Sequence, residues 1–267
     1  MKLSRVAGAV SALALTVGLA FGGAGAAHSA ERASTPAYVA LGDSYSSGVG
    51  AGSYDSASGS CKRSTRAYPA LWAAAHRPSS FAFVACSGAR TGDVLGKQLG
   101  ALTPATGLVS ISVGGNDAGF ADTMTSCVLG SDSSCLERIA KARAYIRDEL
   151  PGRLDAVYSA VRSKAPQARV VVLGYPRFYR TGVACAGLSD TKRKAINAAA
   201  DHIGTVTAKR AADHGFAYGD VNATFAGHEL CSGSAWLNSV TLPVDESYHP
   251  NAAGQSGGYL PVFAAAS

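Results

Sequence analysis

Short runs of apolar residues recur along the chain and alternate with longer stretches that have helical spacing. Each run holds four to six residues between glycine, proline or polar positions, as expected of strands that are buried on both faces. The predicted strands are Ala37–Leu41, Phe81–Ala85, Leu108–Val113, Val170–Leu173 and Phe216–Val221. The alternation predicts an α/β fold in which helices cover both faces of a parallel sheet.

Two segments have the periodicity of an amphipathic helix. The first is predicted to begin near Ser134, whose hydroxyl would cap it while Glu137 completes a capping box. Its apolar positions fall on one face: Leu136, Ile139, Ile146, Leu150, Leu154, Val157 and Val161. Pro151 is expected to kink or divide this helix, because proline lacks the backbone N–H that a helix interior requires.

The second helix is predicted to run from Ser189 or Asp190 to His214, with Gly215 just beyond its end. The region from Thr224 to Ser247 shows little periodicity and is interpreted as a loop. No internal repeat or long linker divides the chain, so residues 34–267 are expected to form a single domain.

Residues 1–30 have the pattern of an export signal. Lys2 and Arg5 precede an apolar stretch from Val6 to Phe21, and small residues follow up to Ala30. The alternative is a transmembrane anchor, but the stretch is short and ends in glycine and alanine rather than a charged stop. We therefore predict a secreted, extracellular protein that is cleaved between about residues 26 and 33.

The six cysteines suit an oxidising compartment. Proximity favours a small Cys127–Cys135 loop, and spacing leaves the other pairs open. Zinc ligation is the alternative, but the chain has no Cys-x-x-Cys pair, so no metal is expected.

The composition is that of a folded and mildly basic domain. Hydrophobic residues make up 47% of the chain and charged residues 16%, which excludes a disordered protein. Removal of Lys2 and Arg5 lowers Lys plus Arg from 24 to 22 against 18 acidic residues, which leaves a net charge of +4. The basic run 192–194 has no interleaved aromatic residues, so no nucleic-acid partner is expected.

Polar turns follow three predicted strands, where they contain glycine, and a further polar turn precedes the C-terminal segment. They are 42–46, 86–89, 114–117 and 245–250. Ligands of open parallel sheets bind at the carboxyl ends of strands, so these turns are expected to converge. Ser44 could act as a nucleophile and His249 as its base, because a serine hydroxyl needs a group that accepts its proton. Backbone N–H groups and an Asn116 amide are suitable donors for an oxyanion.

These turns resemble the blocks of the GDSL, or SGNH, hydrolase family. The blocks are Gly42-Asp43-Ser44, Gly88, Gly114-Gly115-Asn116-Asp117 and His249-Pro250, in that order over the whole mature chain. Length, export signal and cysteine count are closer still to the secreted actinomycete-type lipases and phospholipases A1 of this family.

The resemblance implies a three-layer α/β/α sandwich with a five-stranded parallel sheet. It implies that Ser44 is the nucleophile and His249 the general base, and it requires no metal or cofactor. The implied oxyanion hole consists of the backbone N–H groups of Ser44 and Gly88 and the side-chain amide of Asn116. The implied disulfides are Cys61–Cys86, Cys127–Cys135 and Cys185–Cys231.

The group that orients His249 is the uncertain point. Many family members have an aspartate three residues before the histidine, where this chain has Glu246, with Asp245 one residue earlier. The similar secreted lipases resemble serine–histidine dyads in which a backbone carbonyl, here that of Ser247, takes the third role. We favour the dyad, with Glu246 and Asp245 as alternatives.

The resemblance implies a carboxylic ester hydrolase that acts on lipid esters, as a triacylglycerol lipase or a phospholipase A1. The expected partners are a lipid or small ester substrate and, transiently, a lipid surface, and the expected state is a monomer. A carbohydrate or aryl esterase with the same machinery is the first alternative. The second is a non-catalytic secreted binding protein, which would have no need of all four blocks.

Overall fold

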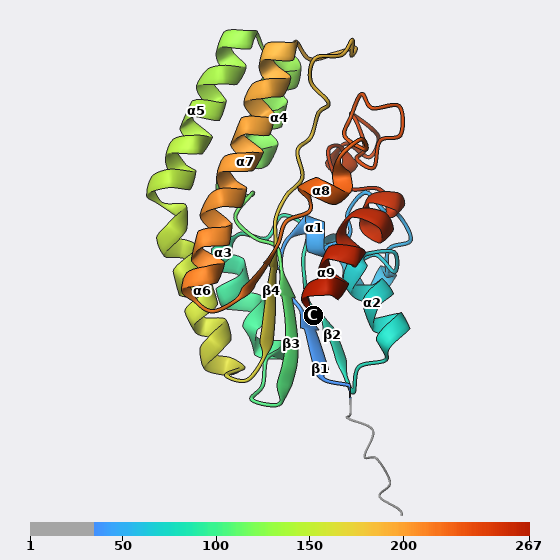
Figure 1. Cartoon of the computed structure of the whole chain (residues 1–267), viewed down its shortest axis with the longest axis vertical. Helices are drawn as coiled ribbons and strands as arrows, with labels where there is room; N and C mark the ends of the chain where they lie inside the picture. The colour runs from blue at the N-terminus through green and yellow to red at the C-terminus, as the bar shows by residue number, and fades with distance from the viewer. Residues whose placement is uncertain (1–34) are drawn as a thin grey trace, which may run out of the picture. The chain divides into compact units, whose positions relative to one another are not determined.

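The computed structural model describes residues 35–267, in which a five-stranded sheet lies between two layers of helices (Figure 1). The strands are β1 (Ala37–Ala40), β2 (Phe81–Phe83), β3 (Thr106–Ile111), β4 (Arg169–Leu173) and β5 (Ala217–Gly219). Their order is β2-β1-β3-β4-β5, and all neighbouring pairs are parallel. The predicted α/β/α sandwich is confirmed, with strand ends shifted by up to two residues. The predicted export signal lies outside the described residues.

Helices cover both faces of the sheet (Figure 1). One layer contains α3 (Thr91–Asp93), α4 (Phe120–Leu129), α5 (Asp132–Asp148), α6 (Leu150–Lys164) and α7 (Asp190–Asp213). The opposite layer contains α2 (Tyr68–His76) and α9 (Leu260–Ala266), which pack on each other, while the short α1 (Ser44–Ser47) and α8 (Asn222–Phe225) lie near the carboxyl ends of the strands. Among the described residues, no helix combines the length and apolarity that a membrane crossing requires.

The long helices follow the predicted periodicity, with one correction. Pro151 divides the first predicted helix, because α5 ends at Asp148 and α6 begins at Leu150. The predicted cap at Ser134 is wrong: α5 begins two residues earlier, and the Ser131 hydroxyl accepts a hydrogen bond from the Ser134 N–H group. Several hydroxyls in succession offered alternative caps, and the first of them caps the helix.

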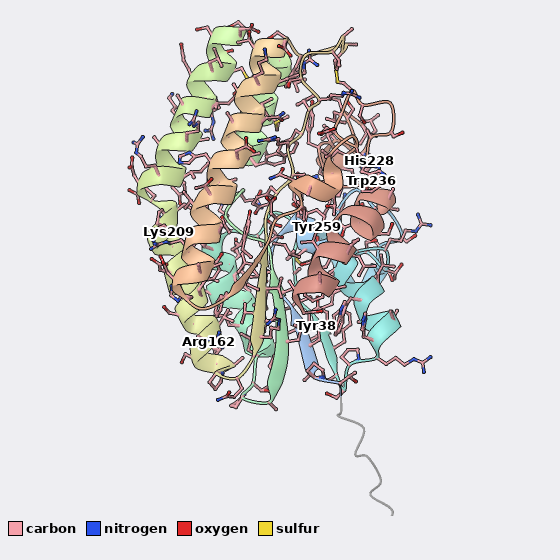
Figure 2. The ribbon with its side chains drawn as sticks, viewed as in Figure 1. Tyr38, Arg162, Lys209, His228, Trp236 and Tyr259 are labelled. Atoms are coloured by element: carbon pink, nitrogen blue, oxygen red, sulfur yellow. A yellow bond between two sulfur atoms is a disulfide. The ribbon has the colours of Figure 1, made fainter. Side chains whose placement is uncertain are left out.

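Aromatic side chains fill the space between the sheet and the layer of α2 and α9. Tyr38 and Tyr259, both labelled in Figure 2, are fully buried, as are Tyr68 and Phe263. The ring of Tyr38 stacks on that of Phe263, and its hydroxyl shares a 2.7 Å hydrogen bond with Ser110 of β3. On the other face, leucine and valine side chains of α6 are fully buried, as their spacing predicts. Leu136, predicted on the same apolar face, is instead 38% exposed at the first turns of α5.

Three disulfides join the described residues: Cys61–Cys86, Cys127–Cys135 and Cys185–Cys231. The first ties the segment after α1 to the turn that follows β2, and the second joins the end of α4 to the start of α5. These are the three pairs that the family resemblance implies, and no free cysteine remains among residues 35–267.

The chain turns sharply after β1 at Gly42, which adopts a φ of 124°. A Cβ atom there would lie 2.5 Å from the Ser112 carbonyl oxygen, so the two turns can approach this closely only with glycine. The buried Gln98 amide fixes the peptide groups on both sides of Gly42, since it accepts from the Gly42 N–H at 2.8 Å and donates to the Gly42 carbonyl at 2.9 Å.

Substitution of Gly42 by alanine should lower the free energy of unfolding by at least about 2 kcal/mol, because the new methyl group meets backbone atoms and the φ angle is strained. Gly96→Ala is the matched control, since a Cβ at Gly96 meets nothing within 4 Å. Urea unfolding of both variants measures the difference. Equal stabilities would contradict the assigned close approach.

Candidate active site

The carboxyl ends of β1 and β3 form the switch point of the sheet. In the sheet, β2 lies on one side of β1 and β3 on the other. The connection that leaves β1 therefore runs toward one edge of the sheet, and the connection that leaves β3 runs toward the opposite edge. Crevices at such points are the usual ligand sites of open parallel sheets. Ser44 follows β1 as the first residue of α1, and Asn116 follows β3. The strand order therefore brings two of the predicted site residues to one crevice.

Ser44 and His249 lie in hydrogen-bond contact although 205 residues separate them. The Ser44 Oγ is 2.8 Å from His249 Nε2, and His249 Nδ1 is 3.0 Å from the Ser247 carbonyl oxygen. A carbonyl only accepts, so Nδ1 must hold the proton, and Nε2 is left to accept from the serine hydroxyl. Both side chains are buried, with 6% of Ser44 and 8% of His249 exposed.

Burial determines the protonation state of this histidine. Desolvation lowers the pKa of His249 from 6.5 to about 4, and the Ser247 carbonyl offsets this only in part. The imidazole is therefore neutral at pH 7, which is the form that can take a proton from Ser44.

The two acidic side chains before His249 are engaged elsewhere. The Asp245 carboxylate is 2.5 Å from the Lys62 Nζ, and the Glu246 carboxylate is 4.0 Å from the same Nζ. The hydrogen-bond partner of Nδ1 is the Ser247 carbonyl and not either carboxylate. The arrangement found is thus that of a dyad with a backbone acceptor.

The predicted oxyanion donors line one groove together with Ser44 and His249. Gly88 and Asn116 both border it. Within the described chain, the backbone N–H groups of Ser44 and Gly88 donate to no protein acceptor, so they are available. The Asn116 amide donates one hydrogen to the Ala89 carbonyl at 3.0 Å, which leaves its second N–H free.

A buried carboxylate lies beneath the nucleophile and was assigned no role by sequence reasoning. Asp43 is 1% exposed and accepts from the Tyr45 N–H at 3.0 Å, the Ser112 hydroxyl at 2.7 Å and the Tyr175 hydroxyl at 2.5 Å. The Tyr175 hydroxyl in turn accepts from the Gly115 N–H at 3.1 Å. This chain of bonds connects the turn that holds Ser44 to the turn that holds Asn116.

Two opposing effects set the ionisation of Asp43. Burial raises the pKa of Asp43 from 3.8 to about 6, and the hydrogen bonds from Tyr175 and Ser112 oppose the rise. Tyr175 follows the fourth strand, and applying the strand-end rule to that strand as well would have found it.

An apolar cavity and an open groove meet at Ser44. The cavity extends between the helices of one layer and is lined by residues that include Met124 of α4, Ile146 of α5 and Ile196 and Ile203 of α7. The groove lies between α4 and the segment 240–249. Asn116, Phe120 and Met124 border both spaces, so a bound molecule with two branches could place one in each.

A serine hydroxyl bonded to a neutral histidine at the switch point of a parallel sheet defines a serine acyl hydrolase by its geometry. Comparison with known families agrees. The chain belongs to the GDSL-like lipase/acylhydrolase family, whose model matches residues 40–256.

Individual relatives are similar over the whole domain. A lipase of Streptomyces rimosus is 69% identical over 268 residues, which span 100% of both chains. The crystal structure of the extracellular lipase from Streptomyces rimosus has a TM-score of 0.86 at 71% identity and covers 87% of this chain and 100% of that chain. The crystal structure of phospholipase A1 from Streptomyces albidoflavus has the same TM-score at 62% identity, with the same coverage.

Tyr175→Phe should lower the free energy of unfolding by about 1–3 kcal/mol, because the buried Asp43 carboxylate loses one of its three donors and the Gly115 N–H is left without a partner. It should also lower kcat more than it changes KM, since the two turns lose their connection. Tyr158→Phe is the control, because the buried Tyr158 hydroxyl makes no hydrogen bond within the described residues. Urea unfolding and steady-state kinetics measure both effects, and equal behaviour of the two variants would rule out the connecting role.

Proposed function

We propose that the protein is a secreted lipid ester hydrolase, a triacylglycerol lipase or phospholipase A1, that works through an acyl-enzyme on Ser44. The observation that supports this most directly is the 2.8 Å contact between the Ser44 Oγ and His249 Nε2 at the junction of the cavity and the groove. The relatives named as lipase and phospholipase A1 support the lipid substrate.

In the first step, Ser44 Oγ attacks the ester carbonyl carbon while its proton passes to His249 Nε2. The tetrahedral intermediate collapses when the same proton passes from Nε2 to the leaving alkoxide, which departs as an alcohol. A water molecule then attacks the acyl-enzyme while its proton passes to His249 Nε2, and the same proton passes on to Ser44 Oγ as the bond to the acyl group breaks, which releases the fatty acid and restores the serine hydroxyl.

The oxyanion of each intermediate would be held by the N–H groups of Ser44 and Gly88 and by the Asn116 amide. The free N–H groups and the fixed orientation of the Asn116 side chain support this assignment. Donors that are positioned in advance stabilise developing charge at no reorganisation cost, so loss of the Asn116 amide should lower kcat about 10²–10³-fold.

In this proposal the Ser247 carbonyl orients His249, and no carboxylate completes a triad. A carbonyl holds the ring tautomer but brings no full charge to stabilise the imidazolium. The burial that lowers the histidine pKa and the missing carboxylate act in the same direction, since both disfavour the charged ring.

The lining of the site supports an apolar acyl group. The cavity beside Ser44 is lined mostly by apolar side chains and is suited to the acyl chain of the scissile ester. The groove would take the remainder of the lipid, which is released as the alcohol.

Export and a monomeric state complete the proposal. The three disulfides fit an oxidising compartment, and the similar lipase of Streptomyces rimosus is described as extracellular.

A phosphonate ester probe should label Ser44 covalently, because only an activated hydroxyl attacks it at a useful rate. Intact-mass measurement should show one adduct on the wild-type chain, none on Ser44→Ala, and one on Ser87→Ala, a control serine in the same groove. A panel of triglycerides and phosphatidylcholines with different sn-1 and sn-2 chains then identifies which ester is cut. Near-normal esterase activity of Ser44→Ala would contradict the mechanism, and hydrolysis restricted to acetylated sugars or aryl esters would replace the lipid substrate.

The acid limb of kcat/KM should lie near pH 4, because His249 must be neutral to act and its pKa is lowered to about 4. Activity is therefore retained as pH falls from 7 through 6.5 and is lost as pH falls through about 4.

Asp245→Asn and Glu246→Gln should keep kcat within about tenfold, whereas loss of a triad carboxylate lowers it about 10⁴-fold. A pH series with a soluble ester tests both points, and a limb near 6.5 or a collapse of either variant would favour a triad.

A further inference from the structure

The most exposed large apolar side chains of the described residues gather at one place. Leu242 is 88% exposed, Leu129 81%, Val244 69% and Val240 58%, while the remaining large apolar side chains are at most 39% exposed. We call these four residues the apolar rim. Exposed apolar residues that cluster rather than scatter mark a contact surface.

The apolar rim surrounds the mouth of the groove that contains Ser44 and His249. Leu129, Val240 and Val244 line this groove directly, and Leu242 lies in the same loop as the two valines. The rim is built from two segments that are distant in sequence, the end of α4 and the loop 240–244. Because the two segments meet at the entrance of this groove, a substrate that enters the groove passes the apolar rim.

The two segments of the apolar rim carry no charge themselves, and the Asp245 carboxylate that directly follows Val244 is paired with Lys62. Neither the stretch 123–131 nor the stretch 230–244 contains Asp, Glu, Lys or Arg. A partner recognised by charge would need such groups, and an anionic membrane would favour Lys or Arg. The chemistry instead fits an uncharged apolar phase.

The apolar rim is held on rigid supports. The end of α4 is fixed by the Cys127–Cys135 disulfide and by Lys192, whose Nζ donates to the Cys127 carbonyl at 2.9 Å and to the Gly130 carbonyl at 2.7 Å. The loop 240–244 is closed at its base by the Thr241 N–H, which donates to the Ser247 hydroxyl at 2.9 Å. Little ordering is therefore required when the rim meets a partner.

We propose that the apolar rim inserts into the surface of neutral or zwitterionic lipid and so docks the groove on the lipid–water interface. This rests on the proposed function, because a lipid ester in an aggregate must reach Ser44, of which only 6% is exposed. Insertion places the groove mouth at the level of the ester groups. The binding free energy comes from removing Leu and Val side chains from water, so the docking is apolar and depends little on salt.

Binding is measured with Ser44→Ala protein, so that the lipid is not consumed, by co-sedimentation with dioleoylphosphatidylcholine vesicles. In that background, Leu242→Gln should lower the partition coefficient about tenfold, and Leu129→Gln with Val244→Gln about 100-fold. Leu95→Gln is the control, since Leu95 is 39% exposed and lines neither the groove nor the cavity. Raising NaCl from about 0.05 to about 0.5 M should change the partition little.

Turnover is measured separately with Leu242→Gln in the active protein. Its kcat/KM on a dissolved short-chain p-nitrophenyl ester should equal that of the wild-type chain, because Leu242 lies outside both the cavity and the groove. Its activity on phosphatidylcholine vesicles or on a triglyceride emulsion should fall in proportion to binding.

Three results of the binding experiments overturn the rim proposal. They are equal vesicle binding by Leu242→Gln and Leu95→Gln, binding that vanishes at high salt, and sedimentation equilibrium showing that Leu242→Gln abolishes a dimer without changing vesicle binding. Hydrolysis of vesicle lipid at an unchanged rate by Leu242→Gln would overturn the rim proposal and leave the proposed function intact. Rim-dependent vesicle binding without hydrolysis of any lipid ester would support the rim and refute the proposed function.

Discussion

The buried carboxylate of Asp43 holds the ends of three strands in fixed relation. It follows β1, its hydroxyl donor Ser112 follows β3, and its second donor Tyr175 follows β4. A carboxylate that is 1% exposed is costly to bury unless donors surround it, so each strand must end where its donor can reach. The positions of Ser44 and Asn116 follow from this constraint, because each lies one residue from a member of the network, Asp43 and Gly115 respectively.

His249 reaches the site from the C-terminal part of the chain, and different contacts fix it. The Tyr45 hydroxyl donates to the Tyr248 carbonyl at 2.7 Å, which ties the residue after Ser44 to the residue before His249. A Cβ on Gly50 would lie 2.9 Å from the His249 Cβ, so the two segments approach as closely as glycine allows. Contacts of the neighbouring residues thus position Ser44 and His249, and the hydrogen bond between these two side chains is a consequence of that positioning.

The sequence predicted those features that have a local signature. The strands were recognisable as apolar runs, and Ser44 and His249 as polar residues at strand ends or in the last block. The helix α4 was not predicted although more than half of its ten residues are apolar, because it is short and follows glycine-rich turns. The bond between His249 Nδ1 and a backbone carbonyl has no side-chain signature, so sequence alone left Glu246 and Asp245 open as partners. Tyr175 could be placed at a strand end, but its bond to Asp43 depends on the order of the strands, which the residue itself does not indicate.

The helix α4 extends along both the apolar cavity and the groove, and it ends at the apolar rim. Phe120 and Met124 border both the apolar cavity and the groove, and Leu129 at the end of the same helix is among the most exposed apolar residues. A helix rises 1.5 Å per residue, so these positions lie at fixed depths along one axis. Because a disulfide and Lys192 anchor the end of α4, the depth of the groove mouth and the depth of the acyl cavity are set by one rigid element. A molecule held at the mouth by α4 therefore meets Ser44 at a distance that the helix itself determines.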